Sequence, residues 1–167
     1  MEQRGRNPVS SPPVQAVIED FLTAADGALP GFIQRLDIVG ALALDDYRPG
    51  ASDIDCIAVI PARPDPGEDT TLRRLHARLQ RRYPRPYFGG FYVTRHALRR
   101  DPTLASGAPE AHVGCLDVRT DPTALAWWAL GNMDGHWRRW HARSGRWSHP
   151  ADIYGSDRGH PPGACSG

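Results

Sequence analysis

One stretch of the chain, residues 36–60, constrains the fold more than any other. It begins as an apolar run, turns at Gly40, passes through a polar loop that closes with Arg48-Pro49-Gly50, and enters a second apolar run at residues 54–60. This second run is rich in isoleucine and valine, which predicts a buried strand. The stretch therefore predicts two strands that are joined by a turn and a loop.

Two carboxylates stand at the entrance of the second predicted strand. Asp53 and Asp55 are two positions apart, and side chains at i and i+2 of a strand point to the same face. Neighbouring carboxylates repel each other unless a cation lies between them, and hard divalent cations prefer oxygen ligands. We therefore predict that Asp53 and Asp55 bind Mg²⁺; the alternative is a pair of caps that close the loop.

The remaining pattern predicts helices and strands in alternation. Helical spacing of apolar residues begins at Pro13 and ends near Gly27, and Glu68 and Asp69 open a second helix. Further elements are expected at 32–39 (strand), 41–44 (helical turn), 87–93 (strand), 95–100 (helix capped by Thr94) and 115–118 (weak strand), with a loop at 103–114. This order indicates an α/β (α+β) protein with a small mixed sheet flanked by helices.

The same reading divides the chain into four parts. Residues 1–12 are expected to form a flexible arm, 13–120 the folded domain, 121–147 a short helical segment that begins at Asp121-Pro122, and 148–167 a disordered tail. A length of 167 residues suits one such domain.

Composition narrows the possible functions. All 20 basic residues are arginine, and without lysine the chain has neither a Schiff-base lysine nor a Walker-type phosphate loop. A net charge of +1 argues against nucleic acid as a partner, and the arginines of residues 73–82 are interpreted as a solvated helix face. An odd number of cysteines, a polar N-terminus and the lack of an apolar membrane span lead us to expect a cytoplasmic protein with no membrane partner.

Three short motifs in residues 36–60 carry a family resemblance. Gly40-Ala41, the loop Arg48-Pro49-Gly50 and Ser52-Asp53-Ile54-Asp55 together resemble the signature of the nucleotidyltransferase superfamily, above all its aminoglycoside adenylyltransferase-type branch. Residues 87–98 add to this likeness, which covers roughly residues 14–100. The resemblance implies a polymerase-beta-like nucleotidyltransferase fold.

The resemblance also implies an activity and a set of site residues. Asp53 and Asp55 would hold Mg²⁺ against the triphosphate of ATP, and the Gly40 backbone would approach the phosphates closely. Other residues are expected beside the nucleotide: Ala41, Arg48 and Ser52. For Ser52 we favour a loop-capping role over a catalytic one. The implied reaction transfers AMP from ATP to a hydroxyl of a small molecule, such as an aminoglycoside.

The chain departs from the family pattern in three ways. Ala41 replaces a serine whose hydroxyl holds phosphate, Asp45 and Asp46 replace a loop glycine, and Phe88–Phe91 lacks the family's third carboxylate. By chain order Asp117 is the nearest substitute for that carboxylate. The departures leave two alternatives open. One is a catalytically degenerate binding protein or toxin–antitoxin partner, and the other is a transferase whose acceptor is a protein or a nucleic-acid end.

Overall fold

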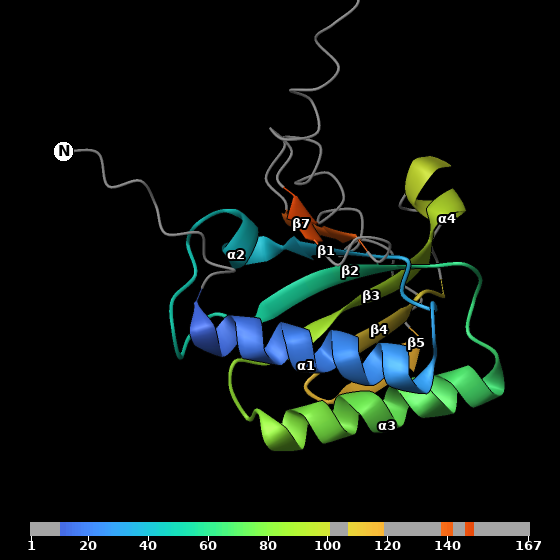
Figure 1. Cartoon of the computed structure of the whole chain (residues 1–167), viewed down its shortest axis with the longest axis horizontal. Helices are drawn as coiled ribbons and strands as arrows, with labels where there is room; N and C mark the ends of the chain where they lie inside the picture. The colour runs from blue at the N-terminus through green and yellow to red at the C-terminus, as the bar shows by residue number, and fades with distance from the viewer. Residues whose placement is uncertain (1–10, 101–106, 119–137, 142–145, 149–167) are drawn as a thin grey trace, which may run out of the picture.

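The computed structural model of the protein describes residues 11–100, 107–118, 138–141 and 146–148. These residues form a mixed α/β fold around one seven-stranded sheet (Figure 1). The strands are β1 (Arg35–Val39), β2 (Ile54–Ile60), β3 (Phe88–Thr94), β4 (Pro109–His112), β5 (Cys115–Val118), β6 (Arg138–His141) and β7 (Arg146–Ser148). The helices are α1 (Pro12–Ala28), α2 (Gly40–Ala43), α3 (Pro66–Arg82) and α4 (Arg95–Arg100).

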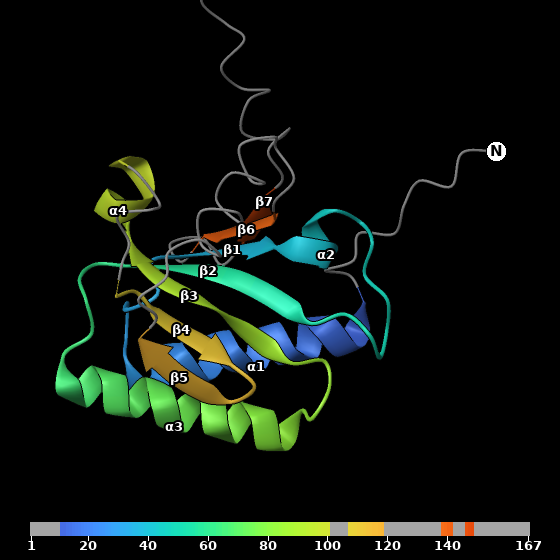
Figure 2. The same ribbon diagram turned by 180° about the vertical axis from the view of Figure 1, so that it is seen from behind.

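The sheet runs in the order β5-β4-β3-β2-β1-β6-β7. Among the strands that the structure describes, β2 with β3 is the only parallel pair, and α3 makes the crossover that a parallel pair requires. The long helices α1 and α3 lie side by side on one face of the sheet, as both views show (Figures 1 and 2). The predicted class, a mixed sheet flanked by helices, is therefore confirmed.

Apolar periodicity explains how the two long helices pack. The predicted stripe of α1 is buried, from Val14 at its start to Ala25 near its end. Leu72, Leu75 and Leu79 of α3 are buried against the same face of the sheet. A smaller apolar cluster, which includes Val39, Ile57 and Phe91, covers part of the opposite face.

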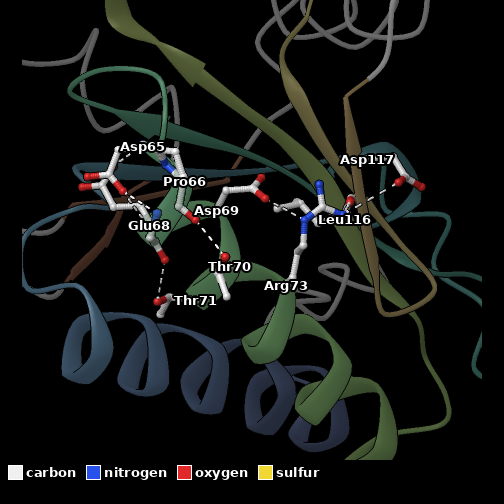
Figure 3. A network of polar contacts seen from close by, with 10 residues as sticks. Asp65, Pro66, Glu68, Asp69, Thr70, Thr71, Arg73, Leu116 and Asp117 are labelled. Carbon is white, nitrogen blue, oxygen red and sulfur yellow. Dashed lines mark hydrogen bonds and ion pairs between the residues drawn. The ribbon is translucent and has the colours of Figure 1, made fainter.

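A capping box starts α3 earlier than expected (Figure 3). The Asp65 carboxylate accepts hydrogen bonds from the backbone N–H groups of Gly67 and Glu68, while the Glu68 carboxylate accepts one from the Asp65 backbone. The helix therefore begins at Pro66, two residues before the expected start at Glu68. The signal is present in the sequence as an aspartate followed three residues later by a glutamate.

Two expectations for the later part of the chain are wrong. Residues 109–112, expected within a loop, form β4 because β3 and β5 supply hydrogen-bonding partners on both sides. Part of the expected helical segment 121–147 consists instead of β6 and the start of β7, and β6 pairs with β1. Residues 119–137 and 149–167, with most of the expected tail, lie outside the described residues, as do residues 1–10 of the expected arm.

Within the described part of the chain, no helix combines the length and the apolar character needed to cross a membrane.

A two-residue turn joins β4 to β5, and both of its residues have positive φ. Val113 has φ 47° and Gly114 has φ 76°, the signs of a type I′ hairpin turn. Glycine and asparagine suit this turn, whereas a β-branched residue with positive φ is strained. Gly114 is also held close to α3, because an added Cβ would lie 2.7 Å from the Gln80 Cβ.

Replacing Val113 with asparagine should therefore stabilise the protein. We expect the free energy of unfolding to rise by about 1 kcal/mol, since asparagine tolerates the left-handed conformation and Val113 loses little burial. Urea unfolding of wild type and variant measures the change. Val118→Asn, at an exposed position in β5, is the matched control and should give no gain. Equal effects of the two substitutions would contradict the strain at Val113.

Candidate functional site

The turn after β1 and the start of β2 meet at one point. Val39 lies opposite Asp55 in the antiparallel pair, and Gly40 begins α2 directly after Val39. Gly40 has φ 65°, and a Cβ added to it would lie 2.5 Å from Oδ2 of Asp55. A side chain at position 40 would thus displace the Asp55 carboxylate. Two segments that the sequence singled out are therefore in contact.

The electrostatics of Asp55 are those of a partly desolvated acid. Burial and, to a smaller extent, the nearby charge of Asp53 raise the pKa of Asp55 to about 6, and the charge of His112 acts in the opposite direction. Asp53 and Asp55 thus interact, as their spacing predicted. Near neutral pH the pair carries repelling negative charges, which a bound cation would relieve.

Arg85 is the cationic partner of Asp53. Its Nη1 lies 3.4 Å from Oδ1 of Asp53, and its guanidinium lies over the Tyr87 ring, 4.0 Å from the centroid. Both members of the ion pair are well exposed to solvent, so the pair is easily exchanged. Tyr47 borders the same carboxylate, since burial and the charge of Asp53 both raise the pKa of its hydroxyl.

The loop before β2 is closed by Ser52. Its Oγ accepts a hydrogen bond of 3.0 Å from the Arg48 backbone N–H, and its own N–H donates to the Arg48 carbonyl. Ser52 therefore has the loop-capping role that we favoured. The Arg48 side chain forms an exposed ion pair with Asp46, at 3.2 Å. Ala41 lies in α2, where its carbonyl accepts a hydrogen bond from the Asp46 backbone.

A glycine occupies the position next to Asp55 on the third strand. In the parallel register Gly89 lies beside Asp55, and Gly90 lies beside Cys56. An added Cβ on Gly89 would lie 2.5 Å from the Ala111 carbonyl oxygen, and one on Gly90 would collide with the Cys56 carbonyl oxygen. The close approach of neighbouring backbones thus requires glycine at both positions. No carboxylate fits there without movement of a strand.

Asp117 is not brought to the carboxylate pair. It lies in β5, separated from β2 by β3 and β4, or by about 14 Å at the usual strand spacing. Its carboxylate faces Arg73 of α3 at 3.9 Å, and Arg73 also pairs with Asp69 and donates to the Leu116 carbonyl (Figure 3). Asp117 thus belongs to the contact between β5 and α3.

The residues at the site suit Mg²⁺ that arrives with a phosphate ligand. Among the described residues, no group of three or more His, Cys, Asp or Glu side chains forms a metal cage. Mg²⁺ commonly retains several waters and uses one or two carboxylates together with substrate phosphates. Asp53 and Asp55 supply that number of carboxylates, and burial of Asp55 makes its negative charge unfavourable without a cation. The donor set therefore fits a metal–nucleotide complex better than a bare ion.

Three site neighbours were missed by the sequence analysis: Tyr47, Arg85 and His112. Arg85 lies 32 positions after Asp53, in the connection between α3 and β3. The parallel pairing of β2 with β3 brings this connection to the start of β2. His112 was missed because its strand was expected to be a loop. No motif in the sequence links these residues to the carboxylates.

Two cavities lie away from the carboxylate pair. One, of about 190 Å³, lies between α1 and α3 and is lined by Asp20, Arg78 and Arg82 among others; the ion pair of Asp20 with Arg82, at 2.9 Å, closes part of it. The other, of about 120 Å³, lies at the end of β2 beside α4. Asp53 and Asp55 line neither of them.

Comparisons of the chain with models of protein families, with curated proteins and with solved structures found no match.

Proposed function

We propose that the protein is a Mg²⁺-dependent nucleotidyltransferase that transfers AMP from ATP to a hydroxyl of a small molecule. The observation that carries the proposal is the contact between the Gly40 turn and the Asp55 carboxylate, with Asp53 beside it. These residues are among those that carry the resemblance to aminoglycoside adenylyltransferase-type enzymes. Aminoglycosides are therefore the first acceptors to test.

The order and pairing of the central elements also support the proposal. A helix, a strand, a short helical turn and an antiparallel strand are followed by a crossover helix and a parallel strand. This arrangement is compatible with the polymerase-beta-like fold that the resemblance implies. It brings a positive-φ glycine and two carboxylates to the same end of the sheet.

Each residue of the site has a distinct part in the proposed reaction. Asp53 and Asp55 would hold the metal, whose chemistry is neutralisation of the triphosphate charge. The Gly40 turn leaves the space beside Asp55 free of a side chain, so that phosphate oxygens have room to approach. Arg85 adds a guanidinium at the edge of the site, where it would face phosphate once Asp53 turns to the metal.

A nucleotide-binding protein without catalytic activity is the second candidate. The observation that favours it is the pair Gly89-Gly90, which leaves no place on β3 for the third carboxylate of the family. Such a protein would still bind ATP with Mg²⁺. It would therefore show a metal-dependent rise in melting temperature with ATP but no turnover.

The direct test is transfer of label from ATP. The protein is incubated with Mg²⁺, α-labelled ATP and a panel of aminoglycosides and other hydroxyl compounds, and both labelled product and released pyrophosphate are measured. We expect labelled acceptor and pyrophosphate from the wild type. The double variant Asp53→Asn/Asp55→Asn should lose about 100-fold or more of this activity, because several kcal/mol of charge stabilisation disappear.

The control is Asp45→Asn/Asp46→Asn, which removes the same charge from the neighbouring loop and should retain activity. Absence of both products above the level of the Asp53→Asn/Asp55→Asn variant, across the panel, would exclude the transferase. A persistent melting shift with ATP and Mg²⁺ would then favour the second candidate.

A further inference from the structure

His112 lies on the same row of the sheet as Asp55. Asp55 pairs with Gly89 in the register of β2 and β3, and Gly90 pairs with Ala111 in the register of β3 and β4. One further step along this antiparallel register sets His112 beside Gly89. Residues directly opposite each other share a face of the sheet, so Asp55 and His112 lie on one face with a glycine between them.

The missing side chain of Gly89 lets β4 come close to the site. A Cβ at position 89 would lie 2.5 Å from the Ala111 carbonyl oxygen and 3.7 Å from the His112 Cα. The backbone of β4 thus takes space that a side chain of β3 would fill. In agreement with this proximity, the charge of His112 acts on Asp55 and lowers its pKa.

The His112 side chain is exposed, while its backbone is held within the β4–β5 hairpin. It is the last residue of β4 and pairs with Cys115 across the hairpin. The turn that follows combines the strained Val113 with Gly114, and Gly114 is in close contact with Gln80 of α3. Strained backbone is frequently found beside functional groups. The imidazole is thus available to a ligand from a fixed position.

We propose that His112, on the strand next to β3, is the general base of the transfer reaction and compensates for the third carboxylate that β3 lacks. This inference rests on the proposed function. His112 accepts the proton of the acceptor hydroxyl as its oxygen attacks the α-phosphorus. The new O–P bond forms while the bond from the α-phosphorus to the bridging oxygen breaks, and pyrophosphate leaves. Imidazole is the side chain most often used as a general base near neutral pH.

The test uses the full chain with His112→Ala, and it measures kcat, the melting shift with ATP and Mg²⁺, and rescue by imidazole. We expect kcat to fall by about 100- to 10,000-fold, which is the usual contribution of a positioned base. The melting shift should persist because Asp53 and Asp55 remain. Added imidazole should restore part of kcat in a concentration-dependent way, a result that a structural role would not produce.

Two variants serve as controls. His96→Ala removes another exposed histidine, in α4, about 20 Å away at the other end of β3, and should leave kcat unchanged. Cys115→Ala removes the exposed thiol that faces His112 in the hairpin and should also be neutral. Loss of activity in Cys115→Ala would overturn the inference, because His112 would then act through the Cys115 thiol rather than as the base itself.

The outcomes separate the inference from the function on which it rests. If the wild type transfers label and His112→Ala does so equally well, His112 is not the general base, and the proposed transferase activity is retained. If His112→Ala loses the melting shift together with activity and imidazole does not help, His112 binds nucleotide instead, and the proposal again fails. If the wild type itself transfers nothing, both are wrong.

Discussion

Asp55→Asn is expected to make the metal-free protein more stable while it removes the response to Mg²⁺. Burial and Asp53 raise the pKa of Asp55 to about 6 from an ordinary value of 3.8. The ionised form at pH 7 therefore costs the folded state about 2–3 kcal/mol relative to the unfolded chain. Asparagine has nearly the same shape and no charge, so the free energy of unfolding should rise by about that amount.

The same substitution should abolish the rise in melting temperature that ATP and Mg²⁺ produce in the wild type, because a metal ligand is lost. Urea unfolding in EDTA and melting curves with ATP plus Mg²⁺ measure the two effects. Asp46→Asn, which removes an exposed carboxylate paired with Arg48, is the control and should change stability by less than about 0.5 kcal/mol. A destabilised Asp55→Asn variant that still responds to Mg²⁺ would contradict both the unfavourable burial of the Asp55 charge and its role as a metal ligand.

Acid stability provides a second measurement on Asp55→Asn, through the buried His76. His76 is 2% exposed, its Nε2 lies 2.7 Å from the Tyr92 hydroxyl oxygen, and burial lowers its pKa to about 4 from 6.5. Between pH 6.5 and 4 the unfolded chain binds more protons at this residue, so its contribution to stability falls by about 3 kcal/mol on acidification. The contribution of Asp55 to stability rises on acidification instead, since the folded state binds more protons at this residue between pH 6 and 3.8.

In the wild type these two contributions oppose each other, and stability should change little between pH 6.5 and 4. In Asp55→Asn only the contribution of His76 remains, so the variant should lose about 3 kcal/mol over this range. Urea titrations at pH 7, 5.5 and 4.5 test the difference between the two slopes. Parallel slopes in the two proteins would show that Asp55 titrates as an ordinary surface carboxylate.

Gly90→Ala should be strongly destabilising, by about 3 kcal/mol or more. Gly90 has φ 154°, and an added Cβ would collide with the Cys56 carbonyl oxygen and lie 2.7 Å from its Sγ. The obstacle is the backbone of β2, which cannot move without breaking the parallel pairing with β3. Positive-φ strain and overpacking each cost about 1–3 kcal/mol.

The matched control for this substitution is Gly27→Ala. Gly27 is exposed in α1, and no atom lies within 4 Å of an added Cβ, so alanine should stabilise the helix by up to about 1 kcal/mol. Chemical unfolding of both variants measures the contrast. Similar stabilities for the two would mean that the backbones of β2 and β3 do not approach each other closely at Gly90.

Local sequence patterns were sufficient to predict most of the helices and strands that surround the site. Helical spacing predicted the buried stripe of α1, and the apolar run at 54–60 coincides with β2. Thr94 caps α4 as expected, since its Oγ1 accepts a hydrogen bond of 3.2 Å from the Ala97 N–H. These features depend on neighbours within a few positions in the chain, which a sequence records directly.

β4 could not be predicted in this way. Its four residues, Pro-Glu-Ala-His, have little intrinsic preference for strand, and the turn after it contains valine at a position that favours asparagine or glycine. The strand exists because β3 and β5 offer hydrogen bonds on both sides. β6 likewise depends on its pairing with β1, which is about 100 positions earlier in the chain.

The sequence by itself determined the carboxylate pair, the glycine turn and the strand that carries Asp55, because each is a local pattern of charge, conformation or hydrophobicity. Only the tertiary structure decided what surrounds the pair. Register places Gly89, rather than a third carboxylate, beside Asp55, and it aligns His112 on the next strand. The crossover brings Arg85 to Asp53. Such neighbours are set by strand pairing and backbone approach, which act between residues far apart in the chain and leave no short motif.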